Sequence, residues 1–539
     1  MSEALETEVA VIGAGVAGAL VADRLAGSAR VTLVEAGPRI DRFAALETFW
    51  RAPVKDPESP YPGGPDYPHP RSHRPDDWYV QSGPEPFRST YLRAVGGTTW
   101  HWLGTTLRFL PDDFRLKSLY GRGEDWPLDY AALEPWYAEA ERALGVAGDG
   151  QEDLGSPRSG PYPLPPIPQS YLDGRLAAGL AGTAYAAVRA TPQARNSVAH
   201  RGRPECCGSG NCVPICPVGA KYDATLHVEA AEAKGARLLE SAVVVRLEAD
   251  GAGRIAAALI RRVDGSALRL TAKTFVLAAH GIESPRLLLN SADAAYPRGL
   301  ANRSDQVGRN LMDHPVQLSW ALAAEPLWPF RGPQSTSGIE TFRGGAFRKE
   351  RPAFRIEIGN DGWAWPEGAP LSTARRLAGA GLTGRALQRA LFERTSRQLR
   401  IDSLIEQLPD PENRVTLDPA LQDRYGVPRP RLAFRLGDYE RRGLAEARRI
   451  HAEIFGHLGA SEVAHRDRFE GGGHIMGTLR MGRDPESSVV DRELRAHDHP
   501  NLFCLGSAVF PTGATANPTL TIAALSLRAA PAIGRSLAQ

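Results

Sequence analysis

The chain has 539 residues, more than one compact core accommodates, so we expect two or more domains. It is 42% hydrophobic and 23% charged with a formal net charge of +2, a balance that is typical of globular proteins and excludes a strong electrostatic field. The arginines from Arg375 to Arg400 alternate with Leu and Ala, which predicts an exposed amphipathic helix and not a nucleic-acid site. Because no run of about 20 apolar residues occurs, we expect no membrane span.

The first 35 residues predict a βαβ unit that binds a dinucleotide. The apolar strand 8–12 is followed by G-x-G-x-x-G, a helix, and a second strand that ends at Glu35. Gly13 permits the tight turn, Gly15 lets a pyrophosphate approach the helix N-terminus, and Gly18 allows close helix–strand packing. A carboxylate at the end of the second strand accepts the hydroxyls of the adenosine ribose. This pattern favours FAD or NAD over NADP, because a 2′-phosphate would meet that carboxylate.

Beyond this unit the pattern alternates between loops and regular elements. Residues 45–90 are rich in Pro, Gly and aromatic residues, and we expect an ordered loop there. Helical periodicity marks residues 127–146, and the proline-dense stretch 153–170 predicts a semi-rigid connector. Residues 237–281 have the pattern of a β-meander that feeds into a core strand, and an apolar helix is expected over 519–537.

Four of the five cysteines lie within one short loop, whereas Cys504 sits in an apolar run and is expected to be a small buried hydrophobe. Clustered thiolates suit an iron–sulfur cluster or zinc, but the second, distant pair usual for zinc is missing from the sequence. Adjacent cysteines point apart in extended backbone, so three ligands are expected: Cys206, Cys212 and Cys216, with Cys207 less certain. Two disulfides, a zinc knuckle and inert thiols remain alternatives.

Several segments, in order along nearly the whole chain, resemble the glucose–methanol–choline (GMC) oxidoreductase family. They are VIGAGVAGALVADRLA, VTLVEAG, VGGTTWHW, FVLAAHGIESPRLLLNS, VGRNLMDHP, HIMGTLRMG and SAVFPTGATANPTLTIAALSLR. The resemblance implies FAD as the dinucleotide. The block CCGSGNCVPICPVGAKY is most similar to the flavoprotein subunits of bacterial glucose, gluconate, fructose and sorbitol dehydrogenases. Those relatives carry a 3Fe–4S cluster at the matching place and work with a small chaperone-like subunit and a multihaem cytochrome c.

The resemblance also implies roles for individual residues. An alcohol gives up hydride to the flavin only as a base removes its hydroxyl proton, and His474 is the candidate base. Asn517, before the final helix, is expected to hold the substrate oxygen. Gly96 and Gly97 are expected to let the backbone approach the flavin. His101 lies in a motif similar to one that attaches the flavin covalently in pyranose oxidase; the alternative is a residue that only packs beside the ring.

The predicted fold class is α/β, with a Rossmann-type FAD-binding domain built from discontinuous segments and a substrate domain built on an antiparallel sheet. The boundaries expected from the sequence are 1–155, 201–318 (with the iron–sulfur loop 206–216) and 465–539 for the FAD-binding domain, 156–200 for a connector and 319–464 for the substrate domain.

The expected function is that of an FAD-dependent sugar dehydrogenase, with glucose C1 as the leading site of oxidation and electrons leaving through the cluster to a cytochrome. Gluconate, fructose, a polyol or a glycoside oxidised at C3 are alternative substrates, and an oxygen-using oxidase is an alternative reaction. A catalytically silent flavin-binding scaffold is disfavoured, because both His474 and Asn517 are present. The resemblance implies a periplasmic protein that is exported with a partner subunit; the N-terminus shows no recognisable export signal, which fits this expectation and the cytoplasmic alternative equally well.

Overall fold

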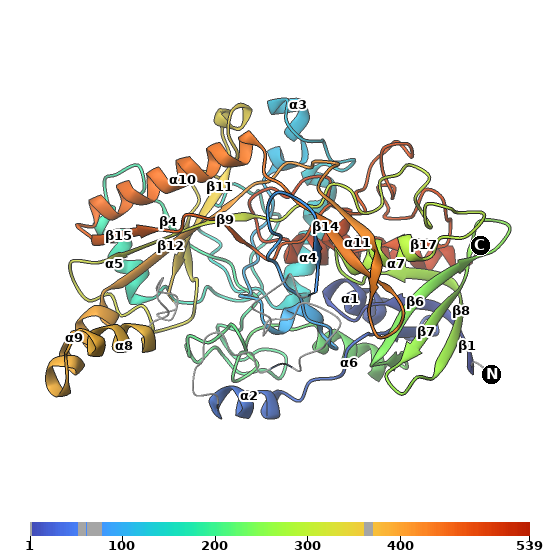
Figure 1. The fold of residues 1–539 in the computed structure, drawn as a ribbon, viewed down its shortest axis with the longest axis horizontal. Coiled ribbons are helices and arrows are strands. Elements are labelled where there is room, and N and C mark those ends of the chain that lie inside the picture. The colour runs from blue at the N-terminus through green and yellow to red at the C-terminus, as the bar shows by residue number, and fades with distance from the viewer. Residues whose placement is uncertain (1–2, 52–60, 62–77, 361–369, 539) are drawn as a thin grey trace.

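Two large sheets form the frame of the molecule (Figure 1). The computed structural model describes residues 3–51, 61, 78–360 and 370–538. Its fold is mixed α/β, with a Rossmann-type sheet assembled from distant segments and a separate antiparallel sheet. This is the class that the sequence predicts.

The first sheet has the strand order β5-β2-β1-β8-β7-β6, with β17 also paired to β8. Strands β1, β2, β5, β8 and β17 pair in parallel, and their apolar runs are buried as in parallel sheets generally. Strands β6, β7 and β8 pair antiparallel, which confirms the predicted meander. The bounds are β1 (Glu3–Ile12), β2 (Val31–Val34), β5 (Arg237–Leu239), β6 (Ala242–Ala249), β7 (Ile255–Arg262), β8 (Ala267–Leu277) and β17 (Leu502–Cys504).

Helices from both ends of the chain cover this sheet. Helix α1 contacts α11 and α6, and α11 also contacts α4 (Figure 1). The helices predicted over 127–146 and 519–537 are thereby confirmed. Their bounds are α1 (Val16–Leu25), α4 (Tyr130–Leu144), α6 (Thr225–Ala233) and α11 (Thr519–Ser536).

The second sheet is antiparallel throughout, with the order β15-β9-β12-β11-β10-β4 and with β16 paired to β9. Helix α10 (Asp438–His457) packs on its apolar face. Strand β4 comes from the segment predicted as a connector; the domain boundaries themselves stay a prediction. The strands are β4 (Val188–Ala190), β9 (Pro315–Leu322), β10 (Ser337–Ile339), β11 (Phe354–Gly359), β12 (Gln398–Ile405), β15 (Ser461–His465) and β16 (Glu470–Gly471).

A third, small sheet joins β13 (Arg414–Gln422), β14 (Pro428–Ala433) and β3 (Val80–Gln81), and α7 (Glu283–Asn290) packs beside it. The loop expected over 45–90 begins within a helix, α2 (Arg42–Arg51), so that part of the prediction is wrong; 52–60 and 62–77 lie outside the described residues. The remaining elements are α3 (Leu116–Tyr120), α5 (Tyr171–Gly179) and the 3-10 turns Gly97–Trp100, Pro111–Phe114, Ala346–Lys349 and Ser507–Val509.

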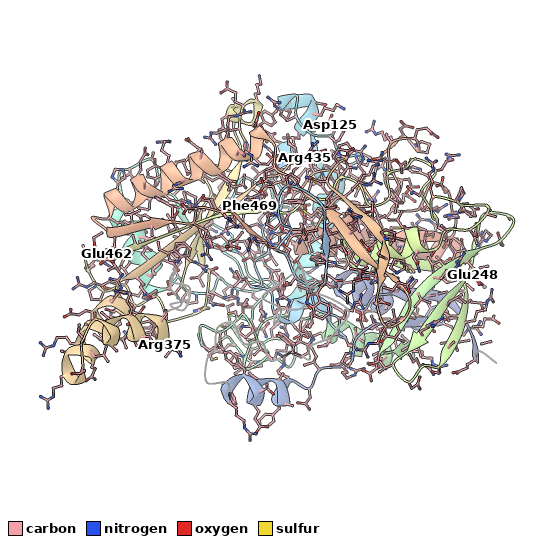
Figure 2. The ribbon with its side chains drawn as sticks, in the orientation of Figure 1. Asp125, Glu248, Arg375, Arg435, Glu462 and Phe469 are labelled. Atoms are coloured by element: carbon pink, nitrogen blue, oxygen red, sulfur yellow. The ribbon has the colours of Figure 1, made fainter. Side chains whose placement is uncertain are left out.

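The arginine-rich stretch forms two mostly exposed helices and not one, α8 (Leu371–Gly379) and α9 (Gly384–Ser396), and Arg400 lies on β12. Figure 2 shows Arg375 on the outside of this hairpin. Arg394 of α9 pairs with Glu462 of β15 at 2.6 and 2.9 Å, which fixes the hairpin to the sheet. None of the helices in the described part has both the length and the apolar character needed to cross a bilayer.

Candidate active site

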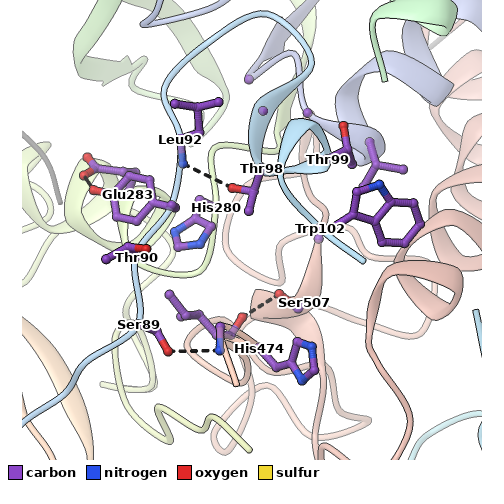
Figure 3. Close-up of a pocket in the computed structure, with 18 of the residues that line it drawn as sticks. Ser89, Thr90, Leu92, Thr98, Thr99, Trp102, His280, Glu283, His474 and Ser507 are labelled. Atoms are coloured by element: carbon purple, nitrogen blue, oxygen red, sulfur yellow. Dashed lines mark hydrogen bonds between the residues drawn. The ribbon is translucent and has the colours of Figure 1, made fainter. Parts of the chain in front are cut away.

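A cavity of about 570 Å³ borders both large sheets and contains most of the predicted site residues. This volume is in the usual range for small-molecule sites. Figure 3 shows His474 beside Ser89 and Ser507, with His280 and Trp102 further along the same cavity. The predicted residues that line it are Gly13, Gly15, Glu35, Gly97, His101, His474 and Asn517, whereas Gly18, Gly96 and the cysteines do not.

The glycines of the first turn are shaped for a phosphate group. Gly13 has φ +104°, and a Cβ there would lie 2.4 Å from the carbonyl oxygen of Ala278. A Cβ on Gly15 would meet no atom within 4 Å, so the N-terminus of α1 is open to the cavity at this point. Gly97 approaches the Gly15 Cα so closely that a Cβ would lie 3.1 Å from it. The turn and the helix amides together fit a pyrophosphate.

Glu35 is placed to bind the ribose of the same dinucleotide. Its two carboxyl oxygens accept the backbone N–H groups of Ala14 and Gly37, each at 2.9 Å, and it lines the cavity. Burial raises the pKa of Glu35 to about 7, although the amide hydrogen bonds and the charge of Arg93 oppose this shift. Both protonation states can hydrogen-bond a hydroxyl group. These residues therefore fit the adenosine diphosphate half of FAD.

His474 lies against a second histidine that the sequence did not single out. The Nδ1 atoms of His474 and His314 are 2.7 Å apart, and the two rings are almost perpendicular. His314 Nε2 lies 3.0 Å from the carbonyl oxygen of Ala514. Burial lowers the pKa of His314 to about 4, and burial together with the neighbouring His314 lowers that of His474 well below 6.5. Both rings are therefore neutral near pH 7.

These contacts determine which nitrogen of each ring carries the proton. A carbonyl only accepts, so His314 Nε2 carries its proton toward Ala514, and His314 Nδ1 has a lone pair. His474 Nδ1 must then be the donor between the rings, and His474 Nε2 has the lone pair that accepts the long hydrogen bond from Asn517 Nδ2. Asn517 Nδ2 lies 3.4 Å from that Nε2. The arrangement presents a neutral base and an amide to the same part of the cavity.

The backbone around this pair is held by a buried carboxylate. Asp313 Oδ1 accepts the N–H groups of His314 and His474, at 2.7 and 2.8 Å. Ser89 donates to the other oxygen of Asp313 and accepts the N–H of Gly473 at 3.1 Å (Figure 3). Asn517 Oδ1 is buried and has no hydrogen-bond partner among the described residues. That oxygen, beside the base, can accept a hydrogen bond from a bound molecule.

His101 and the cysteine loop meet beside the cavity. Burial and, second, the charge of Lys221 lower the pKa of His101 to about 3. The buried Lys221 Nζ donates to the carbonyl oxygens of Trp100 and Trp102, at 2.8 and 2.5 Å, and to that of Cys212 at 2.8 Å. Val213, next to this cysteine, lines the cavity. Lys221 thus fixes the cysteine loop to the turn that carries His101.

The four thiols of the cysteine loop differ in burial. Cys212 and Cys216 are buried, Cys206 is partly buried and Cys207 is exposed, and all four thiols are free. Within the described ranges no three Cys, His, Asp or Glu side chains lie close enough together to hold a metal ion. Cys206, Cys212 and Cys216 are nevertheless near enough to influence one another electrostatically, and the iron–sulfur cluster stays a prediction. Cys504 is fully buried, and burial raises its pKa to about 12.

Sequence reasoning missed several residues of the cavity. His314 and His280 lie in segments that were used for the resemblance, VGRNLMDHP and FVLAAHGIESPRLLLNS, but neither was given a role. His280 has φ +79° and stacks on Tyr91 at 4.3 Å. Strands β11 and β12 contribute Glu357 and Asp402, and the alternation of polar and apolar residues on these strands was the available signal.

Comparison with known proteins assigns this chain to a family of enzymes. Family models of the GMC oxidoreductases match residues 170–316 and 409–526. The chain belongs to the GMC oxidoreductase family, whose members are FAD-dependent oxidoreductases that act on alcohol groups.

Curated relatives match over most or all of the chain. The fructose dehydrogenase large subunit of Gluconobacter japonicus is 40% identical and covers 100% of this chain and 99% of its own. The 2-methyl-1,2-propanediol dehydrogenase of Mycolicibacterium austroafricanum is 29% identical, over 98% and 95%. The gluconate 2-dehydrogenase flavoprotein of Pantoea cypripedii is 24% identical, over 82% and 78%.

Solved structures share the fold at low sequence identity. Pyridoxine 4-oxidase from Mesorbium loti matches with a TM-score of 0.65 at 18% identity, over 97% of this chain and 98% of that chain. Formate oxidase matches with a TM-score of 0.65 at 16% identity, over 99% of both.

Proposed function

We propose that this chain is the catalytic flavoprotein of a sugar or polyol dehydrogenase. The observation that carries the proposal is the neutral His474 Nε2, with Asn517 beside it, in the cavity whose other residues fit FAD. The substrate class is supported by the full-length similarity to a fructose dehydrogenase large subunit. D-Fructose is therefore the first substrate to test, and oxidation of glucose at C1 stays a prediction.

In the proposed reaction His474 Nε2 accepts the hydroxyl proton of the substrate. Asn517 Nδ2 donates a hydrogen bond to the same substrate oxygen as negative charge develops on it. His314 Nδ1 continues to accept the hydrogen bond from His474 Nδ1 and stabilises the imidazolium that results. Gly13, Gly15, Glu35 and Gly97 would hold FAD, which would supply the acceptor for the hydride of the carbon that bears the hydroxyl. His101 lines the same cavity, and release of the flavin on acid denaturation would exclude a covalent bond through this residue.

The test is anaerobic addition of D-fructose, D-glucose, sorbitol or D-gluconate to the purified holoenzyme while the visible spectrum is recorded. We expect at least one of the four to bleach the flavin band within seconds. A flavin that stays oxidised with all four overturns the proposal. Fast reoxidation by air with a stoichiometric yield of peroxide would instead favour the oxidase alternative.

We further propose that Cys206, Cys212 and Cys216 bind a 3Fe–4S cluster and that the chain works with a small chaperone-like subunit and a multihaem cytochrome c in the periplasm. The support is the clustering of these thiols beside the cavity and the large-subunit and flavoprotein names of relatives. Iron and acid-labile sulfide in anaerobically purified protein, lost in Cys216→Ser, are expected; their absence from the wild type refutes the cluster.

A further inference from the structure

One face of the second sheet is polar where it borders the cavity. Along β11 and β12 the side chains alternate: Ile356 and Ile401 join the apolar cluster beneath α10, whereas Glu357 and Asp402 line the cavity. The two acidic residues are register partners across the strands, so their Cβ atoms lie roughly 5 Å apart. Both are buried, with 4% and 5% of their surface exposed.

Two arginines on the same face hold these carboxylates in place. Arg355 donates to Glu357 Oε1, and Arg400 lies 3.1 Å from Asp402 Oδ2. Arg400 crosses the sheet over Gly359, where a Cβ would come within 2.5 Å of its Nε. A side chain at position 359 would therefore displace the Arg400 guanidinium from its present place. Carboxylates fixed in this way need little reorganisation to bind a ligand.

The position of the pair relative to the base suits a long substrate. The next cavity residue on β12, Leu404, pairs with Val316 of β9, which follows His314 by two residues. Asp402 pairs with Leu318, four residues beyond His314, which is roughly 13 Å along the strands between the Cα atoms. Glu357 and Asp402 thus lie further along the cavity wall than the end of β9 that carries His314. The distance between the acidic pair and the histidines suits a substrate several carbons long.

The chemistry of the pair selects hydroxyl groups. An ionised carboxylate only accepts hydrogen bonds, and no described residue donates to Glu357 Oε2. Adjacent hydroxyls of a sugar or polyol supply such donors. A sugar acid would instead bring its own carboxylate toward Glu357 and Asp402, and the like charges would repel. Arg400 already pairs with Asp402 and so does not offset this repulsion.

We infer that Glu357 and Asp402 bind hydroxyl groups of a neutral polyhydroxylated substrate, at the end remote from the oxidised carbon, and that the site discriminates against sugar acids. This inference rests on the proposed function and narrows its substrate class to neutral sugars and polyols.

The test uses the isosteric variants Glu357→Gln and Asp402→Asn, with Glu325→Gln, an exposed carboxylate that pairs with Arg175 outside the cavity, as the matched control. The rate of anaerobic flavin bleaching is measured against the concentration of D-fructose, D-glucose, sorbitol and D-gluconate. Each cavity variant is expected to raise the half-saturating concentration of a neutral substrate roughly 10- to 100-fold, the effect of losing a charge-assisted hydrogen bond, with the limiting rate within about threefold. The control is expected to match the wild type.

Four outcomes separate the claims. A wild type that prefers the neutral substrates, with both shifts present, supports the inference. A wild type that reacts best with D-gluconate overturns the inference but leaves the proposed function standing. If both variants have normal FAD content and the same half-saturating substrate concentration as the wild type, the inference is also overturned and the proposed function still stands. Failure of all four compounds to bleach the wild type overturns the proposed function and the inference together. If one variant loses FAD, the half-saturating concentration of the other variant and the substrate preference of the wild type still test the inference.

Discussion

The contact between the two histidines makes a quantitative prediction about catalysis. His314→Leu removes the acceptor of the 2.7 Å hydrogen bond from His474 Nδ1. When His474 takes the substrate proton, that bond becomes charge-assisted and stabilises the cation by about 1.5–3 kcal/mol. Because each 1.4 kcal/mol is tenfold in rate, the limiting rate of flavin bleaching should fall roughly 10- to 150-fold. The half-saturating substrate concentration should change less than about threefold, since the bond strengthens only as the proton moves.

The assay is anaerobic rapid mixing, with FAD content and melting temperature measured for each variant. His314→Asn is the informative control, because its Oδ1 takes approximately the place of Nδ1 and keeps an acceptor for His474. We expect the Asn variant to retain most of the rate that the Leu variant loses. A correctly folded, FAD-loaded Leu variant that bleaches at the wild-type rate would refute the reasoning, and so would equally slow Leu and Asn variants.

Three other consequences concern stability, cofactor binding and the cysteine loop. Burial lowers the pKa of His451 to about 3, so the unfolded chain binds more protons below pH 6.5 and stability rises as pH increases through that range. At pH 5 this residue costs roughly 2 kcal/mol, and His451→Gln should flatten the dependence of the melting temperature on pH from 5 to 6.5; an unchanged slope contradicts this. Gly15→Ala should leave the melting temperature of the FAD-free protein unchanged, because a Cβ there meets no atom within 4 Å, yet lower the FAD content; full FAD retention would argue against the pyrophosphate position. Lys221→Met removes three hydrogen bonds to carbonyl oxygens and should speed labelling of the buried Cys212 by a thiol reagent, whereas wild-type labelling would show that Lys221 does not fix the loop.

The parts of this protein that the sequence predicted well are local. The turn of Gly13, Gly15 and Gly18 lies within six residues, and its conformation depends mainly on glycine and on the flanking strand and helix. The meander of β6, β7 and β8 is likewise a run of neighbouring strands. The split of the arginine-rich stretch into α8 and α9 was missed, although Gly379, Gly381 and Gly384 are the signals that mark such a break.

What could not be predicted depends on contacts between distant segments. His314 and His474 are 160 residues apart, and they are brought together by the pairing of Pro315 with Gly471 across β9 and β16 and by Asp313, which accepts the backbone N–H groups of both histidines. The acidic pair on β11 and β12 is similar: alternation indicates that Glu357 and Ile356 face opposite ways, but not which face meets the cavity. The cysteine block stays a prediction: the four thiols lie in one loop, as the sequence shows, but no three ligands are assembled into a metal site among the described residues.

The central claim is that His474 removes the substrate proton in the FAD-binding cavity. Its most direct test is the limiting rate of anaerobic flavin bleaching in His474→Ala, with His457→Ala as an exposed-histidine control. Because a positioned general base contributes about 10²- to 10⁴-fold, we predict at least a hundredfold loss in His474→Ala with FAD retained, and a wild-type rate in the control. An FAD-loaded His474→Ala protein that is bleached as fast as the wild type would contradict the account.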